Sequence, residues 1–310
     1  MKILVTGGAG FIGSHIVDAY ISDGHSVVVV DNLSTGRREN IHPRATFYQV
    51  DVRSPDLRSV FEKELPEIVN HHAAQMDIRR SVADPMDDAM INIVGGLRLF
   101  ESCREFRVRK LVFASTGGAI YGEQRYFPAD EDHPTNPLSP YGIAKLSSEK
   151  YLFYYHQIFG LDATVLRYAN IYGPRQNPHG EAGVVAIFAH KMLAGKQPII
   201  NGDGTQTRDY TFVGDVVRAN QLALDARGFR IYNVGTGIET DVRALFRALR
   251  DRLAPSCNES FGPAKPGEQL RSVISCARIH KELGWRPLVY VEEGLERTVA
   301  SFKAGSEGRS

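Results

Sequence analysis

A cluster of glycines directly after the first apolar segment constrains the fold of this chain more than any other feature. Residues Lys2 to Gly13 are Lys-Ile-Leu-Val-Thr-Gly-Gly-Ala-Gly-Phe-Ile-Gly, and residues 14–17 continue with a helical pattern. This order predicts a buried strand, a tight turn and a helix start. The glycines of the spacing Gly8-x-Gly10-x-x-Gly13 have three roles in such a motif. They allow the φ angles that the tight turn needs, let the backbone approach a pyrophosphate, and let the helix pack closely on the strand. The 29 glycines of the chain also produce such spacings in ordinary turns, so this pattern alone does not identify a function.

A second apolar run, residues 26–30, ends in an acid eighteen residues after Gly13. A carboxylate at this point, Asp31, can accept both hydroxyls of an adenosine ribose, which favours NAD over NADP. Arg37 and Arg38 raise the opposite possibility, because an arginine can hold the 2′-phosphate of NADP. The Asp31 carboxylate would repel that phosphate, so we interpret both arginines as solvated loop charges.

The size and charge of the chain exclude several classes of protein. Its 310 residues, 43% of them hydrophobic, can form one large or two closely joined domains. The 37 basic and 36 acidic residues leave a formal net charge of +1 with no long run of like charge, so we expect no nucleic-acid partner. No stretch approaches a membrane span or a signal-peptide core, so we expect a cytoplasmic protein without a membrane partner.

Neither the three cysteines nor the adjacent histidines His71 and His72 indicate a metal site. Cys103, Cys257 and Cys276 lie far apart without metal-ligand or redox spacing, which is typical of incidental thiols in a reducing compartment. His71 and His72 are adjacent on a predicted strand and therefore face opposite ways, which favours packing or capping roles. We expect no metal site.

Strand-like and helical segments alternate along the first half of the chain. The strand-like runs are Ala45–Val50, Glu67–His71, Lys110–Ala114 and Ala163–Arg167, and the helical patterns include Leu57–Leu65, Asp87–Phe106 and Tyr141–Phe159. This alternation predicts an α/β fold, a doubly wound parallel sheet with helices on both faces.

After about residue 170 this alternation ends, and we expect a smaller lobe that closes over the first. The expected segments there are short strands at Pro198–Asn201 and Ile231–Val234 and helices at Val184–Ala194, Val213–Ala226, Thr240–Leu253 and Val291–Lys303. The predicted domains are 1–170 and 171–310, with some segments of the second returning to the first.

A tyrosine and a lysine four residues apart begin one predicted helix, in the segment Ser139–Lys145. Tyr141 and Lys145 therefore share a helix face. A free tyrosine loses its proton at about pH 10, whereas a nearby positive charge favours the phenolate, so we expect Lys145 to lower the pKa of Tyr141. A lone Tyr-x-x-x-Lys is usually only a surface pair, but here it follows the glycine turn and a hydroxyl pair.

That hydroxyl pair is Ser115-Thr116, which ends the predicted strand 110–114. The carboxyl ends of strands are where open parallel sheets bind their ligands. A hydroxyl there can bridge a substrate oxygen and Tyr141.

Taken together, these features resemble the extended short-chain dehydrogenase/reductase family, and most closely its sugar-nucleotide branch of NAD-dependent epimerases and dehydratases. Further segments that look like its motifs are Asp31–Gly36, His72–Gln75, Asn92, Arg167–Arg175 and Gly202–Tyr210. The resemblance implies a Rossmann-type NAD-binding domain that includes the Tyr141 helix, and a smaller C-terminal α/β lobe that binds a sugar nucleotide.

The resemblance also implies which residues hold the ligands. Those expected to bind NAD are Gly7, Gly10, Phe11, Ile12, Gly13, Asp31, Asn32, Ser34, Thr35, Gly36, Asp51, Val52, Ala73, Ala74, Gln75, Asn92, Ser115, Tyr141, Lys145 and Tyr168. Those expected to bind the substrate are Thr116, Tyr141, Asn170, Gly183, Val184, Val185, Gln206, Arg208, Lys265, Glu268, Arg271 and Ser272. Arg208 could instead pair with Asp209, but neighbours on a strand point to opposite faces.

Within the branch, the residues after Thr116 favour epimerisation at the 4-position of a UDP-hexose. Dehydratases of the family carry an acid immediately after the catalytic Ser or Thr, where this chain has Gly117-Gly118. The implied catalytic residues are Tyr141, Lys145 and Thr116, with Tyr141 as the base at the sugar 4-hydroxyl. A nucleotide-sugar dehydratase or reductase is the alternative, and a non-catalytic NAD-binding regulator is a third possibility that the intact Tyr141, Lys145 and Thr116 disfavour.

The chain departs from the family pattern at a few positions. The loop after Thr116 is one residue longer than usual, so Ser115 and Thr116 could exchange roles. A family lysine is Met76 here, and a late family arginine is Lys265, for which Arg271 could compensate. Ser272 occupies the position that gates an N-acetyl group, so we expect both UDP-glucose/UDP-galactose and their N-acetyl forms to fit.

The aromatic run Tyr151–Tyr155 covers much of a predicted helix. Packing of one side in the core would explain part of it. The resemblance implies that this helix and residues 87–106 also form a four-helix homodimer interface.

Overall fold

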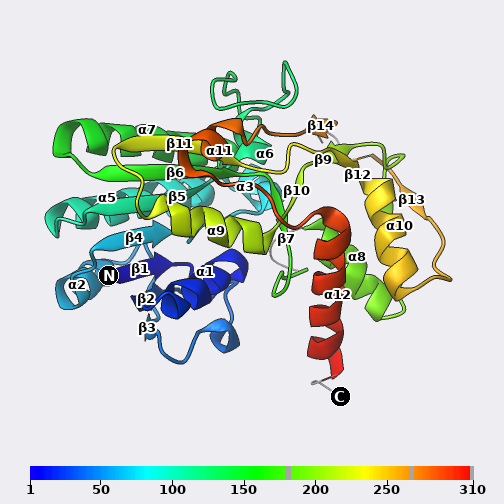
Figure 1. Cartoon of the computed structure of the whole chain (residues 1–310), viewed down its shortest axis with the longest axis horizontal. Helices are drawn as coiled ribbons and strands as arrows, with labels where there is room; N and C mark the ends of the chain where they lie inside the picture. The colour runs from blue at the N-terminus through cyan, green and yellow to red at the C-terminus, as the bar shows by residue number, and fades with distance from the viewer. Residues whose placement is uncertain (179–182, 265–268, 308–310) are drawn as a thin grey trace.

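A seven-stranded sheet lies between two layers of helices, and a smaller helical lobe lies beyond the carboxyl ends of its strands (Figure 1). The computed structural model of the protein describes residues 1–178, 183–264 and 269–307. Among these residues, no helix is both long and apolar enough to cross a membrane.

The sheet is entirely parallel and has the order β11-β6-β5-β4-β1-β2-β3. Its strands are β1 (Lys2–Thr6), β2 (Ser26–Val30), β3 (Thr46–Tyr48), β4 (Ile68–His71), β5 (Lys110–Thr116), β6 (Asp162–Tyr168) and β11 (Phe229–Val234). The strand order reverses between β1 and β4. In a doubly wound sheet this reversal opens a crevice at the carboxyl ends of the strands, where ligands bind.

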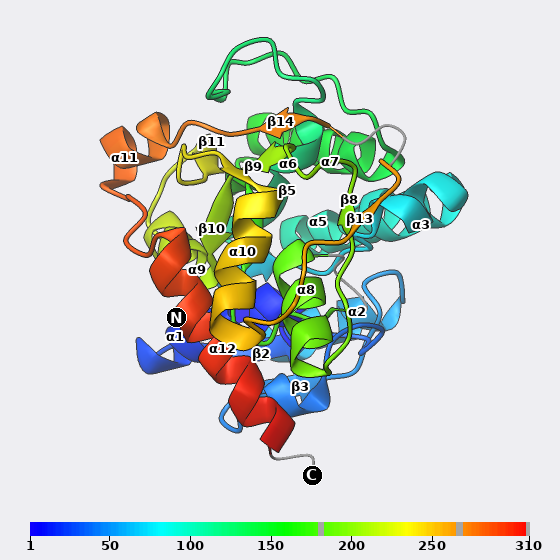
Figure 2. The same ribbon diagram turned by 90° about the vertical axis from the view of Figure 1, so that its right-hand side faces the viewer.

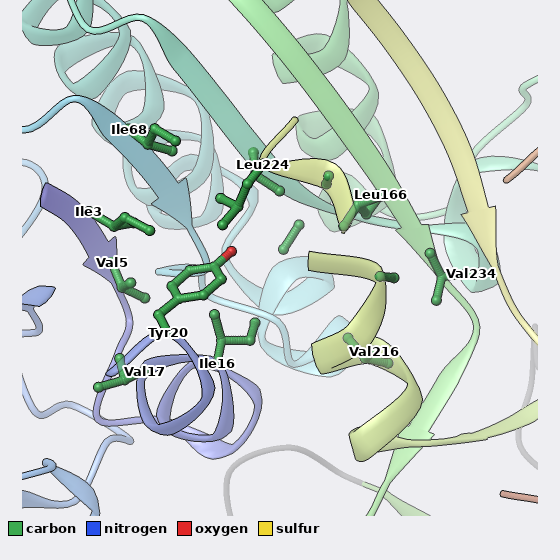
Figure 3. Packing of buried hydrophobic residues seen from close by; sticks show 14 of the residues in the cluster. Ile3, Val5, Ile16, Val17, Tyr20, Ile68, Leu166, Val216, Leu224 and Val234 are labelled. Atoms are coloured by element: carbon green, nitrogen blue, oxygen red, sulfur yellow. The ribbon is translucent and has the colours of Figure 1, made fainter. Parts of the chain in front are cut away.

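The strands are apolar on both faces, because each face is covered by helices. Ile3 and Val5 of β1 pack in one core cluster, whereas Leu4 packs in the other. The first cluster lies against α1 and α9, and Figure 3 shows Tyr20 and Val216 from these helices among the strand side chains. The covering helices are α1 (Phe11–Ser22) and α9 (Val213–Ala223) on this face, and α2 (Asp56–Glu64), α5 (Gly95–Glu105) and α7 (Pro140–Phe159) on the other.

The smaller lobe has its own apolar core between three helices, which face the viewer in Figure 2. These helices are α8 (Val184–Leu193), α10 (Val242–Leu253) and α12 (Val291–Glu307). The short strands of the second half are β7 (Asn170–Tyr172), β8 (Ile200–Asn201), β9 (Thr207–Arg208), β10 (Tyr210–Phe212), β12 (Thr240–Asp241), β13 (Phe261–Gly262) and β14 (Arg271–Ser272). The remaining helices are η1 (Arg38–Asn40), α3 (Ile78–Ala83), α4 (Pro85–Ala89), η2 (Met90–Val94, a π-helical turn), α6 (Gly117–Ile120) and α11 (Ala277–Leu283).

The predicted parallel α/β sheet is confirmed, with differences at element ends. Strand β5 continues through Thr116, so both hydroxyl residues lie within it. The helix expected over 87–106 is divided by the π-helical turn of residues 90–94. The division at residue 170 stays a prediction. Two segments of the second half belong to the larger domain, since β11 is a strand of the main sheet and α9 packs against that sheet.

Asp215 of α9 fastens the final segment of the chain to the sheet domain. Its side chain is 1% exposed and accepts hydrogen bonds from the backbone N–H groups of Leu288 and Val289. Its carbonyl oxygen accepts from Nε1 of Trp285, the single tryptophan of the chain. The direction of the chain as it enters α12 therefore depends on one buried carboxylate.

Asp215→Ala should lower the free energy of unfolding by about 2–6 kcal/mol, because one buried and one partly buried backbone N–H lose their acceptor at about 1–3 kcal/mol each. Denaturant titration followed by Trp285 fluorescence measures this. Arg218→Ala, which removes the partly exposed ion-pair partner of Asp215 and its hydrogen bond to the Arg286 carbonyl, is the control and should cost no more than about 1 kcal/mol. Equal losses in both variants would contradict this role of Asp215.

Candidate functional site

The glycine turn after β1 is packed so closely that side chains have no room. Gly7 has φ +69°, and a Cβ there would lie 2.6 Å from the Ala73 backbone nitrogen. A Cβ on Gly13 would lie 2.2 Å from the Gly7 carbonyl oxygen. Gly10 is the N-cap of α1 and brings no side chain to it, so the N–H groups of Phe11 and Ile12 begin a helix without a side-chain cap. A helix N-terminus of this kind fits a pyrophosphate, which agrees with the prediction from the sequence.

Asp31 lies where β2 ends, and its carboxylate organises the loop that follows. One oxygen accepts from Ala9 N–H at 3.0 Å and the other from Leu33 N–H at 2.8 Å. Burial raises its pKa. Gly36 folds over the carboxylate, since a Cβ there would lie 2.8 Å from Asp31 Oδ1. Arg38 donates to Gln49 and lies over the Phe47 ring, contacts away from the carboxylate.

Polar side chains continue this edge of the crevice at the end of β3. Asn32 donates to Asp51 Oδ2 at 2.8 Å, and Arg53 forms a two-point ion pair with the same carboxylate. The hydrogen bonds from Arg53 hold the pKa of Asp51 well below its usual range. Ser34 and Thr35 are exposed in the intervening loop, whereas Val52 is buried.

Beyond β4, two reciprocal hydrogen bonds join Gln75 and Asn92. Gln75 N–H donates to Asn92 Oδ1 at 3.0 Å, and Asn92 Nδ2 donates to the Gln75 carbonyl at 2.8 Å. The preceding Ala73 N–H donates to Thr6 Oγ1 of β1, so Ala73 and Ala74 lie at the strand ends. Met76 is exposed.

Asp88, a residue not predicted from the sequence, binds both members of this pair. Its Oδ1 accepts from both Gln75 Nε2 and Asn92 Nδ2 at 3.0 Å, and the residue is 1% exposed. The available signal was an acid four residues before Asn92 in one helical segment.

Tyr141 and Lys145 lie on the first turns of α7, as predicted. Ser139 caps this helix by accepting from Gly142 N–H at 3.2 Å. Lys145 is buried, donates to the Ala114 carbonyl of β5 at 2.8 Å, and its Nζ lies 5.8 Å from the Tyr141 ring centroid. The pair therefore lies against β5 near its carboxyl end.

The expectation that Lys145 lowers the pKa of Tyr141 is wrong for the protein's own groups. Burial, and then the charge of Asp88, raise the pKa of Tyr141 above its usual value of 10.0. Burial also lowers the pKa of Lys145 to about 8. Desolvation disfavours the charged form of each residue, and it is the largest cause of both pKa shifts.

The two hydroxyls at the end of β5 have different surroundings. Ser115 is buried and donates to Glu149 Oε1 at 2.6 Å, so its hydroxyl faces the interior and does not support the predicted cofactor contact. Thr116, the N-cap of α6, is partly exposed. A Cβ built on Gly118 would lie 3.9 Å from Thr116 Oγ1 and 3.6 Å from Asn170 Oδ1. Thr116 and Asn170 thus flank an open position, which favours Thr116 over Ser115 as the reacting hydroxyl.

The side chain of Tyr168, another predicted cofactor contact, lies mainly in the interior. Its hydroxyl accepts from Asn220 Nδ2 at 2.8 Å and lies 3.0 Å from His72 Nε2, and its ring stacks on that of His72. His71 faces Thr6 of β1, with Nδ1 and Oγ1 2.7 Å apart. Both histidines take the packing roles expected of them.

The described substrate residues that were predicted for the smaller lobe lie at α8, at or just before β9, and on β14. Gly183 is the N-cap of α8, where Val184 is partly exposed. Val185 is 1% exposed, and its side chain packs in the apolar core of the lobe. Gln206 lies just before β9 and donates to the Asn201 carbonyl.

Arg208 ends β9, and its neighbour Asp209 has other partners. The Asp209 carboxylate accepts from Thr236 and Gly237 and is 1% exposed. This agrees with the prediction that Arg208 and Asp209 point to opposite sides. Ser272 of β14 pairs with Arg208 in the sheet and is buried.

Arg271 is already engaged by protein groups. It forms an ion pair with Glu239 at 2.5 Å, and its guanidinium lies 3.8 Å from the Phe127 ring centroid. It would have to leave this carboxylate to compensate for Lys265. Lys265 and Glu268 lie outside the described residues.

Comparison with known proteins agrees with this geometry. Residues 3–235 match the NAD dependent epimerase/dehydratase family. A UDP-glucose 4-epimerase of Mycolicibacterium smegmatis is 45% identical over 99% of this chain and 100% of its own length.

Two solved structures are similar along their whole length. A UDP-glucose 4-epimerase of Thermotoga maritima, solved with UDP-glucose, is 47% identical with a TM-score of 0.97, over 99% of this chain and 100% of that one. A UDP-glucose 4-epimerase of Thermus thermophilus, solved with NAD, is 46% identical with a TM-score of 0.93, over 98% and 99%. The chain therefore belongs to the NAD dependent epimerase/dehydratase family.

Proposed function

We propose that the protein epimerises the 4-position of a UDP-hexose through a 4-keto intermediate, with NAD as cofactor. The observation that carries this proposal is the placement of Thr116, Tyr141 and Lys145 at the carboxyl end of β5, with glycines at positions 117 and 118. A dehydratase needs an additional general acid, and neither glycine can donate a proton. The relatives named UDP-glucose 4-epimerase support the same activity.

The glycine turn and Asp31 fit the dinucleotide. The turn offers only backbone at the N-terminus of α1, and the Asp31 carboxylate lies at the tip of the neighbouring strand. We assign Phe11 and Ile12 to the pyrophosphate and Asp31 to the adenosine ribose. When bound, NAD supplies the hydride acceptor for carbon 4 and the positive charge of its oxidised ring.

In the proposed mechanism Tyr141 takes the proton from the sugar 4-hydroxyl, and Thr116 orients the same oxygen. The buried protein groups favour the neutral phenol, so formation of the phenolate depends on the Lys145 ammonium together with the cofactor's charge. Inversion requires the sugar ring to turn between loss and return of hydrogen at carbon 4. The nucleotide end must therefore be held more firmly than the hexose, and we assign that role to Asn170, Gln206 and Arg208.

We also propose a homodimer formed through α7 and the helices around residues 78–90. These surfaces carry large apolar side chains that are at least two-fifths exposed: Ile78, Val82, Met86, Met90, Tyr151, Phe153, Tyr154 and Phe159. Helices α3 and α4 contact α7, and exposed apolar side chains on neighbouring helices favour a protein interface. The free thiols of Cys103, Cys257 and Cys276 support a cytoplasmic location.

Tyr141→Phe should reduce turnover by roughly a hundredfold or more, because the variant has no base at the 4-hydroxyl. The assay incubates the protein with UDP-glucose and separates the epimers, which the parent should interconvert without net NADH formation. Tyr290→Phe, at an exposed tyrosine outside the site and the proposed interface, is the control. Activity near that of the parent in Tyr141→Phe would exclude the mechanism.

Asp31→Ala should weaken NAD retention, because the loop loses an acceptor for two N–H groups and the ribose loses its carboxylate. The NAD content per chain after dialysis measures this, and Asp23→Ala on the surface should match the parent. Improved use of NADP with unchanged NAD binding would refute the ribose assignment.

Ser272→Tyr should suppress turnover of N-acetylated UDP-hexoses while sparing UDP-glucose. The added ring would fill the space beside the second carbon of the sugar, an effect of about 1–3 kcal/mol for each methylene-sized change. Ser272→Ala, which keeps the small volume, should epimerise both kinds of sugar. Equal loss of both reactions in Ser272→Tyr, or no N-acetyl turnover in the parent, would contradict a gate at this position.

A further inference from the structure

Asp88 is a buried acid for which neither the sequence motifs nor the proposed mechanism has a role. Its Oδ1 is shared by the Gln75 and Asn92 amides at 3.0 Å. Its Oδ2 is fully enclosed by protein and has no hydrogen-bond partner. A carboxylate oxygen in this state is costly unless a positive charge nearby offsets it.

The backbone around Asp88 links it to the catalytic helix. Asn92 lies in the π-helical turn of residues 90–94, and its carbonyl accepts from Ser148 Oγ of α7 at 3.3 Å. Such turns are rare and occur often at functional sites. The Asp88–Asn92 pair is therefore anchored to the helix that carries Tyr141 and Lys145.

The charge of Asp88 acts on both of these residues. It raises the pKa of Tyr141, and it raises the pKa of Lys145 against the lowering effect of burial. Burial raises the pKa of Asp88, and the hydrogen bonds from the two amides and then the Lys145 charge offset this effect only in part. The other titratable groups around this cluster are Asp87 on the same helix, Glu149 on α7, and His71 and His72 at the end of β4.

We propose that Asp88 is a positioning residue of the reaction, whose carboxylate clamps the Gln75 and Asn92 side chains beside the helix that carries Tyr141 and Lys145. The proposal rests on the proposed function, in which the crevice beside these two amides holds NAD. Asp88 touches neither substrate nor cofactor in this scheme and acts through the two amides, and its negative charge in addition favours the ammonium form of Lys145.

Two variants separate the charge from the clamp. Asp88→Asn keeps a carbonyl oxygen for the two amide donors but removes the charge. Asp88→Ala removes both, and leaves Gln75 Nε2 and Asn92 Nδ2 with only their carbonyl acceptors, Asp77 O and Gln75 O. NAD retention after dialysis should stay close to that of the parent in Asp88→Asn and fall severalfold in Asp88→Ala.

The charge is tested by titrating Lys145 in protein labelled with [ε-13C]lysine, with its NMR signal assigned by Lys145→Arg. Asp88→Asn should lower the pKa of Lys145 by about half a unit to one unit. The pH dependence of turnover should move to lower pH, because loss of a negative charge lowers the pKa of Tyr141 as well as of Lys145. The control is Asp87→Asn, the neighbouring partly exposed acid that pairs with Arg80, and it should leave Lys145 within about 0.2 unit.

Equal NAD loss in Asp88→Asn and Asp88→Ala would overturn the proposal. If Asp88→Asn does not fold, Asp88→Ala decides, and NAD retention equal to that of the parent in this variant would overturn the proposal. An unchanged Lys145 titration in Asp88→Asn would contradict the effect of the Asp88 charge on Lys145. A parent that epimerises no UDP-hexose would refute the proposed function, but the NMR titration would still test the charge of Asp88.

Discussion

The buried ion pair between Glu149 and Arg167 holds helix α7, which carries Tyr141 and Lys145, on the sheet. Arg167 of β6 donates two hydrogen bonds to the Glu149 carboxylate of α7, at 3.0 and 2.7 Å, and both side chains are almost completely buried. The same carboxylate accepts from Ser115 of β5. A buried pair of this kind adds little net stability, but loss of one partner is costly because the other charge remains buried. Its contribution here is geometric, since Lys145 lies one turn before Glu149 and contacts β5 at Ala114.

Burial also determines the protonation states that Tyr141 and Lys145 favour. Desolvation raises the pKa of Tyr141 and lowers that of Lys145, so the protein groups alone favour a neutral phenol. In the proposed mechanism the phenolate therefore depends on the Lys145 ammonium together with the positive charge of the oxidised cofactor. The proposed role of Tyr141 as a base is thereby coupled to occupation of the dinucleotide crevice.

Much of the site was predictable because its signals are local. The glycine turn, Asp31 at the tip of β2, and Tyr141 with Lys145 on one helix face each depend on spacing within a few residues, and the structure places them as expected. The alternation of apolar runs and helical patterns likewise predicted the parallel sheet. The strands of the smaller lobe were harder, because elements such as β9 and β14 have only two residues and carry no periodic signal.

The sequence by itself determined the α/β class, the dinucleotide turn and the identity of the candidate catalytic side chains, because these follow from local backbone requirements and residue chemistry. Only the tertiary structure decided that Ser115 donates to Glu149 while Thr116 and Asn170 lie near Gly118, and that Asp88 binds the Gln75 and Asn92 amides. It also decided the direction of the Tyr141 pKa shift. The physical reason is that burial and long-range pairing set these properties, and both depend on residues that are distant in the chain.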